Sequence, residues 1–158
     1  MGSNNPITIF RGLNGFCSIV KKPIIHHVME QLLLAQVMGA LLGFLGVLFG
    51  AFGAHYLKRK LSEDQARAFE TGVRYQLLHA VLLVVLSFNL TFTSPLETYI
   101  ARAFLVGTIL FSFSIYGLVL SDVFGKKWRF LGPVTPLGGL LLLIGWALLG
   151  YSFVAGFF

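Results

Sequence analysis

The most informative pattern in this chain is the spacing of its charged residues. Four long runs contain no Asp, Glu, Lys or Arg, and they measure 27, 22, 19 and 29 residues. A helix rises about 1.5 Å per residue, so about 20 apolar residues cross the roughly 30 Å hydrocarbon layer of a membrane. Each run is therefore long enough to cross a membrane once. The runs are Gln31–Leu57, Tyr75–Leu96, Ala103–Ser121 and Phe130–Phe158.

The runs predict helices rather than barrel strands, because they are continuously apolar and do not alternate between polar and apolar positions. Ser94-Pro95 ends the second span and Gly132-Pro133 opens the fourth. Short connections make neighbouring helices antiparallel. The sequence therefore predicts an all-α membrane protein, a four-transmembrane-helix antiparallel bundle. Its spans are expected at about 32–55, 75–93, 103–121 and 134–155.

The second helix is expected to begin well before its membrane span. Ser62 and Gln65 have the spacing of a capping box. The residues that follow place Glu four positions before Arg twice, the arrangement that favours ion pairs on one helix face, at Glu63–Arg67 and Glu70–Arg74. Only Gly72 interrupts the helical pattern. We therefore expect an amphipathic extension of about three turns on the cytoplasmic side, either upright or bent at Gly72 to lie on the membrane surface.

Composition excludes a soluble protein. The chain is 56% hydrophobic and only 11% charged, with a mean hydropathy of +0.82, whereas soluble domains carry about 25% charged residues. The net charge of +6 would suggest nucleic acid in a soluble protein, but in a membrane protein it indicates orientation toward anionic lipid. We therefore expect the lipid bilayer as a partner and no nucleic acid. The single Cys17 excludes an internal disulfide.

The basic residues also predict an orientation. The first and third loops carry eight Lys and Arg, and the opposite side carries four. The positive-inside rule then places these two loops in the cytoplasm and both termini outside. The membrane is expected to be the bacterial plasma (inner) membrane, with the mitochondrial inner membrane as the alternative.

Residues 1–28 differ in kind from the rest of the chain. They combine basic residues with no acid before Glu30, and their apolar patches are too brief for a signal-peptide core. We treat 1–28 as an N-terminal tail that is either disordered or not native, and 29–158 as the four-span membrane domain.

Three stretches resemble a known family. They are Gly50–His55, then Phe69–Gln76 with His79-Ala80, and Leu131–Gly139 with Gly145-Trp146. Their order and spacing are similar to those of the small membrane proteins grouped as domain of unknown function 423, related to transmembrane protein 256. The resemblance runs from about Met29 to Tyr151. It implies a small multi-span membrane protein, and it implies no particular reaction.

Glycines line one face of the first span. Small residues at this spacing let helix backbones approach closely, which matters because lipid gives helices no hydrophobic reason to associate. We expect them to serve packing within the chain, with a seam between copies of the chain as the alternative. Glycines of the fourth span suggest that helix as the partner. The expected packing residues are Gly39, Gly43, Gly46, Gly50 and Gly53, with Gly138 and Gly145.

Polar residues gather toward the cytoplasmic third of the predicted bundle. An ionisable side chain inside a membrane is a functional hypothesis by default, and His79 is the strongest case here. The alternative is a neutral histidine satisfied by one Tyr, Ser or carbonyl group nearby. Polar groups in hydrocarbon should face inward and meet, so we predict one cluster formed by His55, Arg74, Tyr75, His79, Tyr116 and Thr135.

No metal or cofactor is expected. His55 and His79 lie at comparable depth, but no Cys, Asp or Glu within the spans completes a zinc set. Two histidines could ligate haem axially, although nothing in the sequence distinguishes such a pair from chance.

Catalytic signatures are also absent from the sequence, including the nucleophile elbow, the phosphate-binding loop and the zinc-protease helix. We therefore expect a non-enzymatic protein that packs with itself or serves as an accessory component of a larger membrane complex. The alternative is a minimal transporter or channel for a small solute or proton, with His79 in its path.

Overall fold

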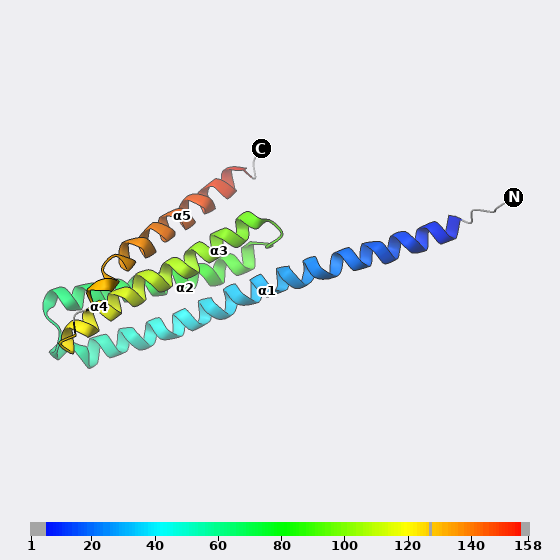
Figure 1. The fold of residues 1–158 in the computed structure, drawn as a ribbon. Coiled ribbons are helices and arrows are strands. Elements are labelled where there is room, and N and C mark those ends of the chain that lie inside the picture. The colour runs from blue at the N-terminus through cyan, green and yellow to red at the C-terminus, as the bar shows by residue number, and fades with distance from the viewer. Residues whose placement is uncertain (1–5, 127, 156–158) are drawn as a thin grey trace.

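The computed structural model describes the backbone of residues 6–126 and 128–155, and the side chains of 25–57, 59–126 and 128–155. Every regular element in these ranges is a helix. α3, the π-helical segment η2 and α4 follow one another without a break (Figure 1). The elements are α1 (Pro6–His55), η1 (Leu57–Arg59), α2 (Glu63–Asn89), α3 (Pro95–Thr108), η2 (Ile109–Phe113), α4 (Ser114–Val123), η3 (Arg129–Leu131) and α5 (Val134–Ala155).

Four helical segments of the described chain are long and apolar enough to cross a membrane. They are Ile25–His55, Glu63–Asn89, Pro95–Val123 and Arg129–Ala155. Three of them contain the spans expected at 32–55, 103–121 and 134–155, whereas Glu63–Asn89 ends four residues before the expected end of the span at 75–93. The prediction of an all-α membrane protein with four spans is confirmed.

α1 and α2 pack side by side along most of their common length. A Cβ added to Gly46 would lie 2.7 Å from Leu77, and one added to Gly53 would lie 2.8 Å from the Phe69 ring. Residue numbers rise along α1 as they fall along α2, so the two helices are antiparallel. The expectation that the glycines of the first span would meet the fourth span is wrong, because α2 occupies that face.

α5 packs instead against α3 and η2. A Cβ added to Gly138 would meet the backbone of Phe111, with the Phe111 Cα 2.8 Å away. A Cβ at Gly145 would lie 3.0 Å from the Phe104 ring. The missing side chains therefore allow α5 to approach the third span closely.

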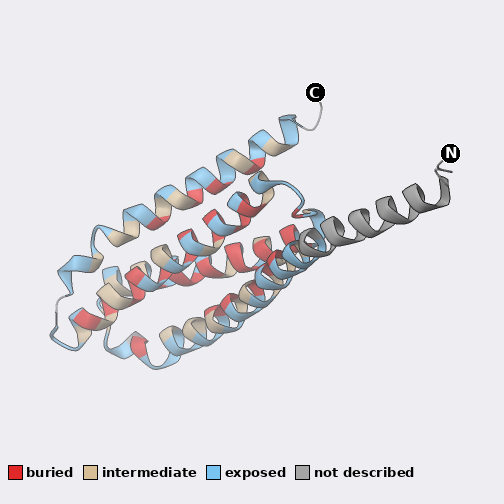
Figure 2. Ribbon diagram, turned by 45° about the vertical axis from the view of Figure 1, so that its right-hand side comes forward, coloured by how far each residue is buried: buried red, intermediate tan, exposed pale blue. Residues whose placement is uncertain are grey.

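Burial is concentrated on α2 and α3, as Figure 2 shows. Leu83, Ile100 and Phe104 are almost completely enclosed. α1 and α5 bury one side and expose large apolar side chains on the other, such as Phe44 and Leu143. In a bilayer this exposed apolar surface contacts acyl chains rather than water.

The start of α2 has the predicted local structure. The Ser62 hydroxyl accepts a hydrogen bond from the Gln65 N–H, and the Gln65 side chain accepts one from the Ser62 N–H. The ion pairs Glu63–Arg67 and Glu70–Arg74 are both present. The capping box and the two ion pairs are thus confirmed.

These first turns of α2 do not stand alone, because they lie against the end of α1. Val73 is 3.3 Å from a Cβ added to Gly50. The helix continues without interruption through Gly72, which the Tyr116 ring covers closely. Whether this part of α2 lies outside the membrane stays a prediction.

The proposed tail overlaps a helix in the structure. α1 begins at Pro6, so its first turns fall within residues 1–28. The side chains of residues 1–24 lie outside the described ones. The division into a tail and a membrane domain therefore stays a prediction.

Candidate functional site

The centre of the bundle holds a buried amide that connects three helices. Gln76 has no exposed surface. Its Nε2 donates to the Leu42 carbonyl oxygen of α1 at 2.8 Å, and the Tyr116 hydroxyl of α4 donates to its Oε1 at 2.8 Å. Such bonds satisfy polar groups that would otherwise be costly in hydrocarbon.

Sequence reasoning missed Gln76, although a signal was present. Gln76 lies three residues after Val73 and four before Ala80, two apolar residues of the same helix. Positions at this spacing share one helix face, so Gln76 had to point into the core.

A second polar contact joins α4 and α5. The hydroxyls of Ser114 and Thr135 lie 2.7 Å apart, and Ser114 also donates to the Phe111 carbonyl oxygen at 2.9 Å. Since a hydroxyl has one hydrogen to donate, Thr135 is the donor in the contact between the two helices.

His79 is buried differently. It is only 2% exposed, and its Nδ1 lies 2.8 Å from the Tyr75 carbonyl oxygen of its own helix. Its Nε2 is buried and has no hydrogen-bond partner among the described residues. The Ser112 hydroxyl on η2 is likewise buried and has no hydrogen-bond partner among the described residues. His79 therefore has an unused hydrogen-bonding atom in an otherwise apolar region.

His79 lines a groove between α2 and α5. The groove has a volume of about 610 Å³. Tyr75, Leu78 and His79 line it from α2 and Phe111 lines it from η2. The lining residues of α5 are Pro136, Gly139, Leu140, Leu142, Leu143 and Trp146. The lining is thus mainly apolar and aromatic.

Within the predicted polar cluster, the Tyr75 and His79 rings stack at 5.9 Å and line one groove. His55, Arg74 and Tyr75 are exposed, and Arg74 pairs with Glu70 at 2.6 Å. Tyr116 and His79 are buried and Thr135 is half-buried, and their hydrogen-bond partners differ: Gln76 for Tyr116, the Tyr75 backbone for His79 and Ser114 for Thr135. No hydrogen bond joins two side chains of the predicted set among the described residues.

A second groove lies where α1 ends and α2 begins. Its volume is about 480 Å³. Small residues line it from α1, namely Gly50, Gly53 and Ala54, and the ion-paired Glu70 and Arg74 line it from α2. Most of its lining residues come from two of the stretches that carry the family resemblance, Gly50–His55 and Phe69–Gln76.

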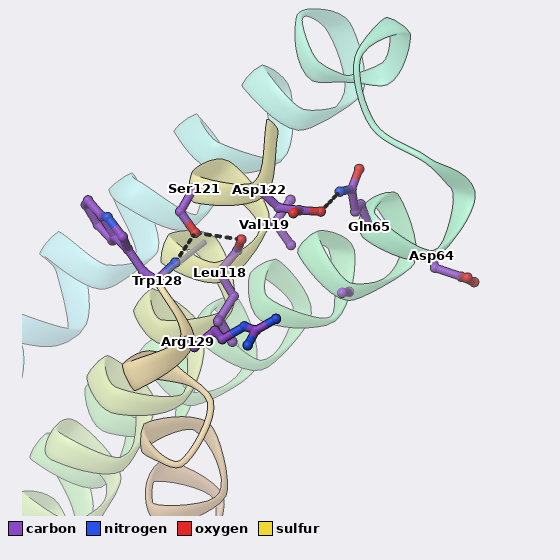
Figure 3. A pocket seen from close by; sticks show the side chains of 9 residues that line it. Asp64, Gln65, Leu118, Val119, Ser121, Asp122, Trp128 and Arg129 are labelled. Carbon is purple, nitrogen blue, oxygen red and sulfur yellow. Dashed lines mark hydrogen bonds between the residues drawn. The ribbon is translucent and has the colours of Figure 1, made fainter. Parts of the chain in front are cut away.

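A third groove lies at the same end of the bundle, between the start of α2 and the end of α4 (Figure 3). The Gln65 side chain donates to the Asp122 carboxylate at 2.6 Å across it, and the Ser121 hydroxyl accepts from the Trp128 N–H at 3.4 Å. The first bond joins the start of α2 to the end of α4, and the second holds the loop after α4 against that helix.

The described residues contain no group of three or more His, Cys, Asp or Glu side chains that could hold a metal ion. The expectation of no metal or cofactor stays a prediction.

Four apolar helices with buried polar contacts between them define a small integral membrane protein of the helical-bundle class. The chain belongs to the family described as "Protein of unknown function (DUF423)", which matches residues 49–139. The resemblance seen in the three sequence stretches is therefore confirmed.

Related proteins carry equally general names. The UPF0382 membrane protein SH2409 of Staphylococcus haemolyticus is 36% identical over 113 residues, which cover 72% of this chain and 88% of the relative. The UPF0382 inner membrane protein YgdD of Escherichia coli K12 is 37% identical over 114 residues, covering 72% and 83%. No solved structure matches the chain.

Proposed function

We propose that this protein is a non-enzymatic accessory component of a larger membrane assembly, in an inner membrane like that named for the Escherichia coli relative. The observation that carries the proposal is the groove lined by Gly50, Gly53 and Ala54. Val73 and Phe69 of α2 already cover Gly50 and Gly53, so the small residue open to a partner helix is the exposed Ala54. A small residue allows a second helix to approach a membrane helix closely.

The charged rim of this groove adds specificity. Glu70 and Arg74 form an exposed ion pair beside the small residues. A partner helix lying on Ala54 would bring its end close to both charges. Charged groups at the edge of an interface contribute to the choice and register of partners more than to affinity.

The test is purification of the tagged full-length chain in a mild detergent. Stoichiometric co-purification with a larger complex supports the proposal. Ala54→Phe places a ring in the groove and should release the partner, whereas Ala51→Phe is the matched control, because Ala51 is exposed on the same helix and does not line the groove.

A lone small particle that transports a solute in liposomes would contradict the accessory role and favour the transporter alternative. The buried, unpartnered Nε2 of His79 is the feature on which that alternative rests. His79→Phe should then abolish transport, while Ala54→Phe should leave it unchanged.

A further inference from the structure

The hydrogen bond on one side of the His79 ring determines what the other side can bind. A carbonyl oxygen only accepts hydrogen bonds, so the Nδ1 atom 2.8 Å from the Tyr75 oxygen carries a hydrogen. Hydrocarbon surroundings favour the neutral imidazole, because charging a buried group is costly. Nε2 is then an acceptor, and it has no donor among the described residues. The group that would complete this site must donate a hydrogen bond.

The walls of the groove indicate the shape of that group. The Tyr75 ring stacks on His79 at 5.9 Å, and the Trp146 ring stands edge-on to His79 at 6.4 Å. The centres of the Phe111 and Tyr75 rings lie 4.7 Å apart. Aromatic rings favour one another in stacked or edge-on contacts at about 4.5–7 Å. A flat ring that carries a hydroxyl suits this frame better than a flexible chain does.

The groove opens toward lipid rather than water. Leu78, Leu140 and Leu143 line it and are more than half exposed, with Leu143 at 68%. In a bilayer these side chains contact acyl chains. A ligand can therefore enter from the membrane and leave an apolar tail among them, and no charged side chain lines the groove to hold a charged head group.

We propose that the groove between α2 and α5 binds a membrane-soluble phenol or hydroquinone that carries an apolar tail. Its hydroxyl donates to His79 Nε2, its ring lies between Tyr75 and Trp146, and its tail runs along the exposed leucines. The site is separate from the groove between α1 and α2, so it does not depend on the accessory role.

The chain provides its own reporter for this binding. Trp128 and Trp146 are the two tryptophans of the sequence, and only Trp146 lines the groove. In a Trp128→Phe variant all tryptophan fluorescence therefore comes from the proposed site. Two probes are compared, 2-bromo-4-nonylphenol and its methyl ether, whose bromine quenches tryptophan on contact. They share the ring and the tail, but only the phenol donates a hydrogen bond.

We expect saturable quenching, with half-saturation by the phenol at a concentration at least tenfold lower than by the ether. His79→Phe should remove this difference. Equal quenching by the two probes in the His79 protein would overturn the proposal, and so would tighter quenching by a brominated diacylglycerol, which carries an aliphatic hydroxyl.

A second pair of variants keeps the test valid if His79→Phe does not fold. A Cβ at Gly139 would have Phe111 as its nearest neighbour, at an ordinary contact distance of 3.7 Å, so Gly139→Leu should fold while filling the groove. Gly150→Leu is the matched control, because nothing lies within 4 Å of a Cβ there. Gly139→Leu should weaken binding of the phenol at least tenfold and Gly150→Leu should not. Unchanged binding in Gly139→Leu would contradict the assignment of the site.

Discussion

The two sides of α2 bury polar side chains in opposite ways. Gln76 faces α1 and α4, and both ends of its amide are hydrogen-bonded to those helices. His79, one turn later, faces the groove beside α5 and is bonded only to its own helix. The first side is closed by close helix contacts, whereas the second is open to lipid.

The difference separates a structural polar group from one that is available for binding. A buried amide with both ends satisfied fixes the relative positions of the helices that hold it. A buried imidazole with one nitrogen unused contributes little to that arrangement. The polar group to examine for function is thus the less satisfied one, His79.

The largest loss of stability should come from adding a side chain where α5 packs closely against η2. Gly138 touches the backbone of Phe111, so Gly138→Ala should force α5 away from η2. Overpacking of this kind costs about 3 kcal/mol when backbone atoms must move. The measurement is the free energy of unfolding in detergent titrated with dodecyl sulfate.

Gly150→Ala is the control for this change. It adds the same methyl group to α5 where nothing lies within 4 Å, and it should be neutral or stabilise the helix by up to about 1 kcal/mol. Equal losses in the two variants would show that the contact at Gly138 does not limit the approach of α5.

The closed side of α2 should be the next most sensitive. Gln76→Leu keeps the volume but leaves the Tyr116 hydroxyl buried without its acceptor. We expect a loss of about 1–2 kcal/mol in unfolding free energy. A double-mutant cycle with Tyr116→Phe should give a coupling of about 0.6–1.7 kcal/mol, the range for hydrogen bonds between membrane helices. No coupling would mean that the two side chains do not interact in the membrane.

The sequence predicted the spans because the membrane imposes a simple rule on them. Long runs without charge are costly to place anywhere but in lipid, so the runs from Gln31 and Tyr75 located their helices directly. The capping box at Ser62 was predictable for a similar reason, since it depends only on local spacing.

The partners of each helix were not predictable in this way. A soluble helix shows its buried face as an apolar stripe, but α5 is apolar all round, so its pattern does not indicate that Gly138 and Gly145 face the third span. The π-helical turn at Ile109–Phe113 likewise has no signature in the sequence.

The polar cluster was inferred from depth and from the tendency of polar groups in hydrocarbon to face inward, without assigning each residue a rotation about its helix axis. Successive helix residues point about 100° apart. Tyr75 and Gln76 therefore have almost the same depth, yet the first is 42% exposed and the second is fully buried.

A smaller loss of stability is expected from a change on the open side of α2, which faces the groove beside α5. His79→Phe removes a hydrogen bond within one helix and keeps a ring of similar size among Tyr75, Phe104 and Trp146. The unfolding free energy should fall by about 0.6 kcal/mol or less. A loss as large as that of Gln76→Leu would show that His79 is a structural residue, with a further partner that stabilises the fold.

The smallest effect on stability should come from Arg74, which the sequence grouped with the buried polar residues. Its ion pair with Glu70 leaves the Arg74 side chain 75% exposed, and exposed pairs contribute about 0.5 kcal/mol or less because water and side-chain entropy offset the attraction. Arg74→Gln should therefore unfold almost like the unaltered protein.

Because Arg74 lines the groove beside Gly53 and Ala54, the same change should reduce co-purification of a partner complex. A loss of stability equal to that of Gln76→Leu, with co-purification unchanged, would instead show that Arg74 is a structural polar residue. The ion pair at the groove between α1 and α2 would then have no role in binding a partner.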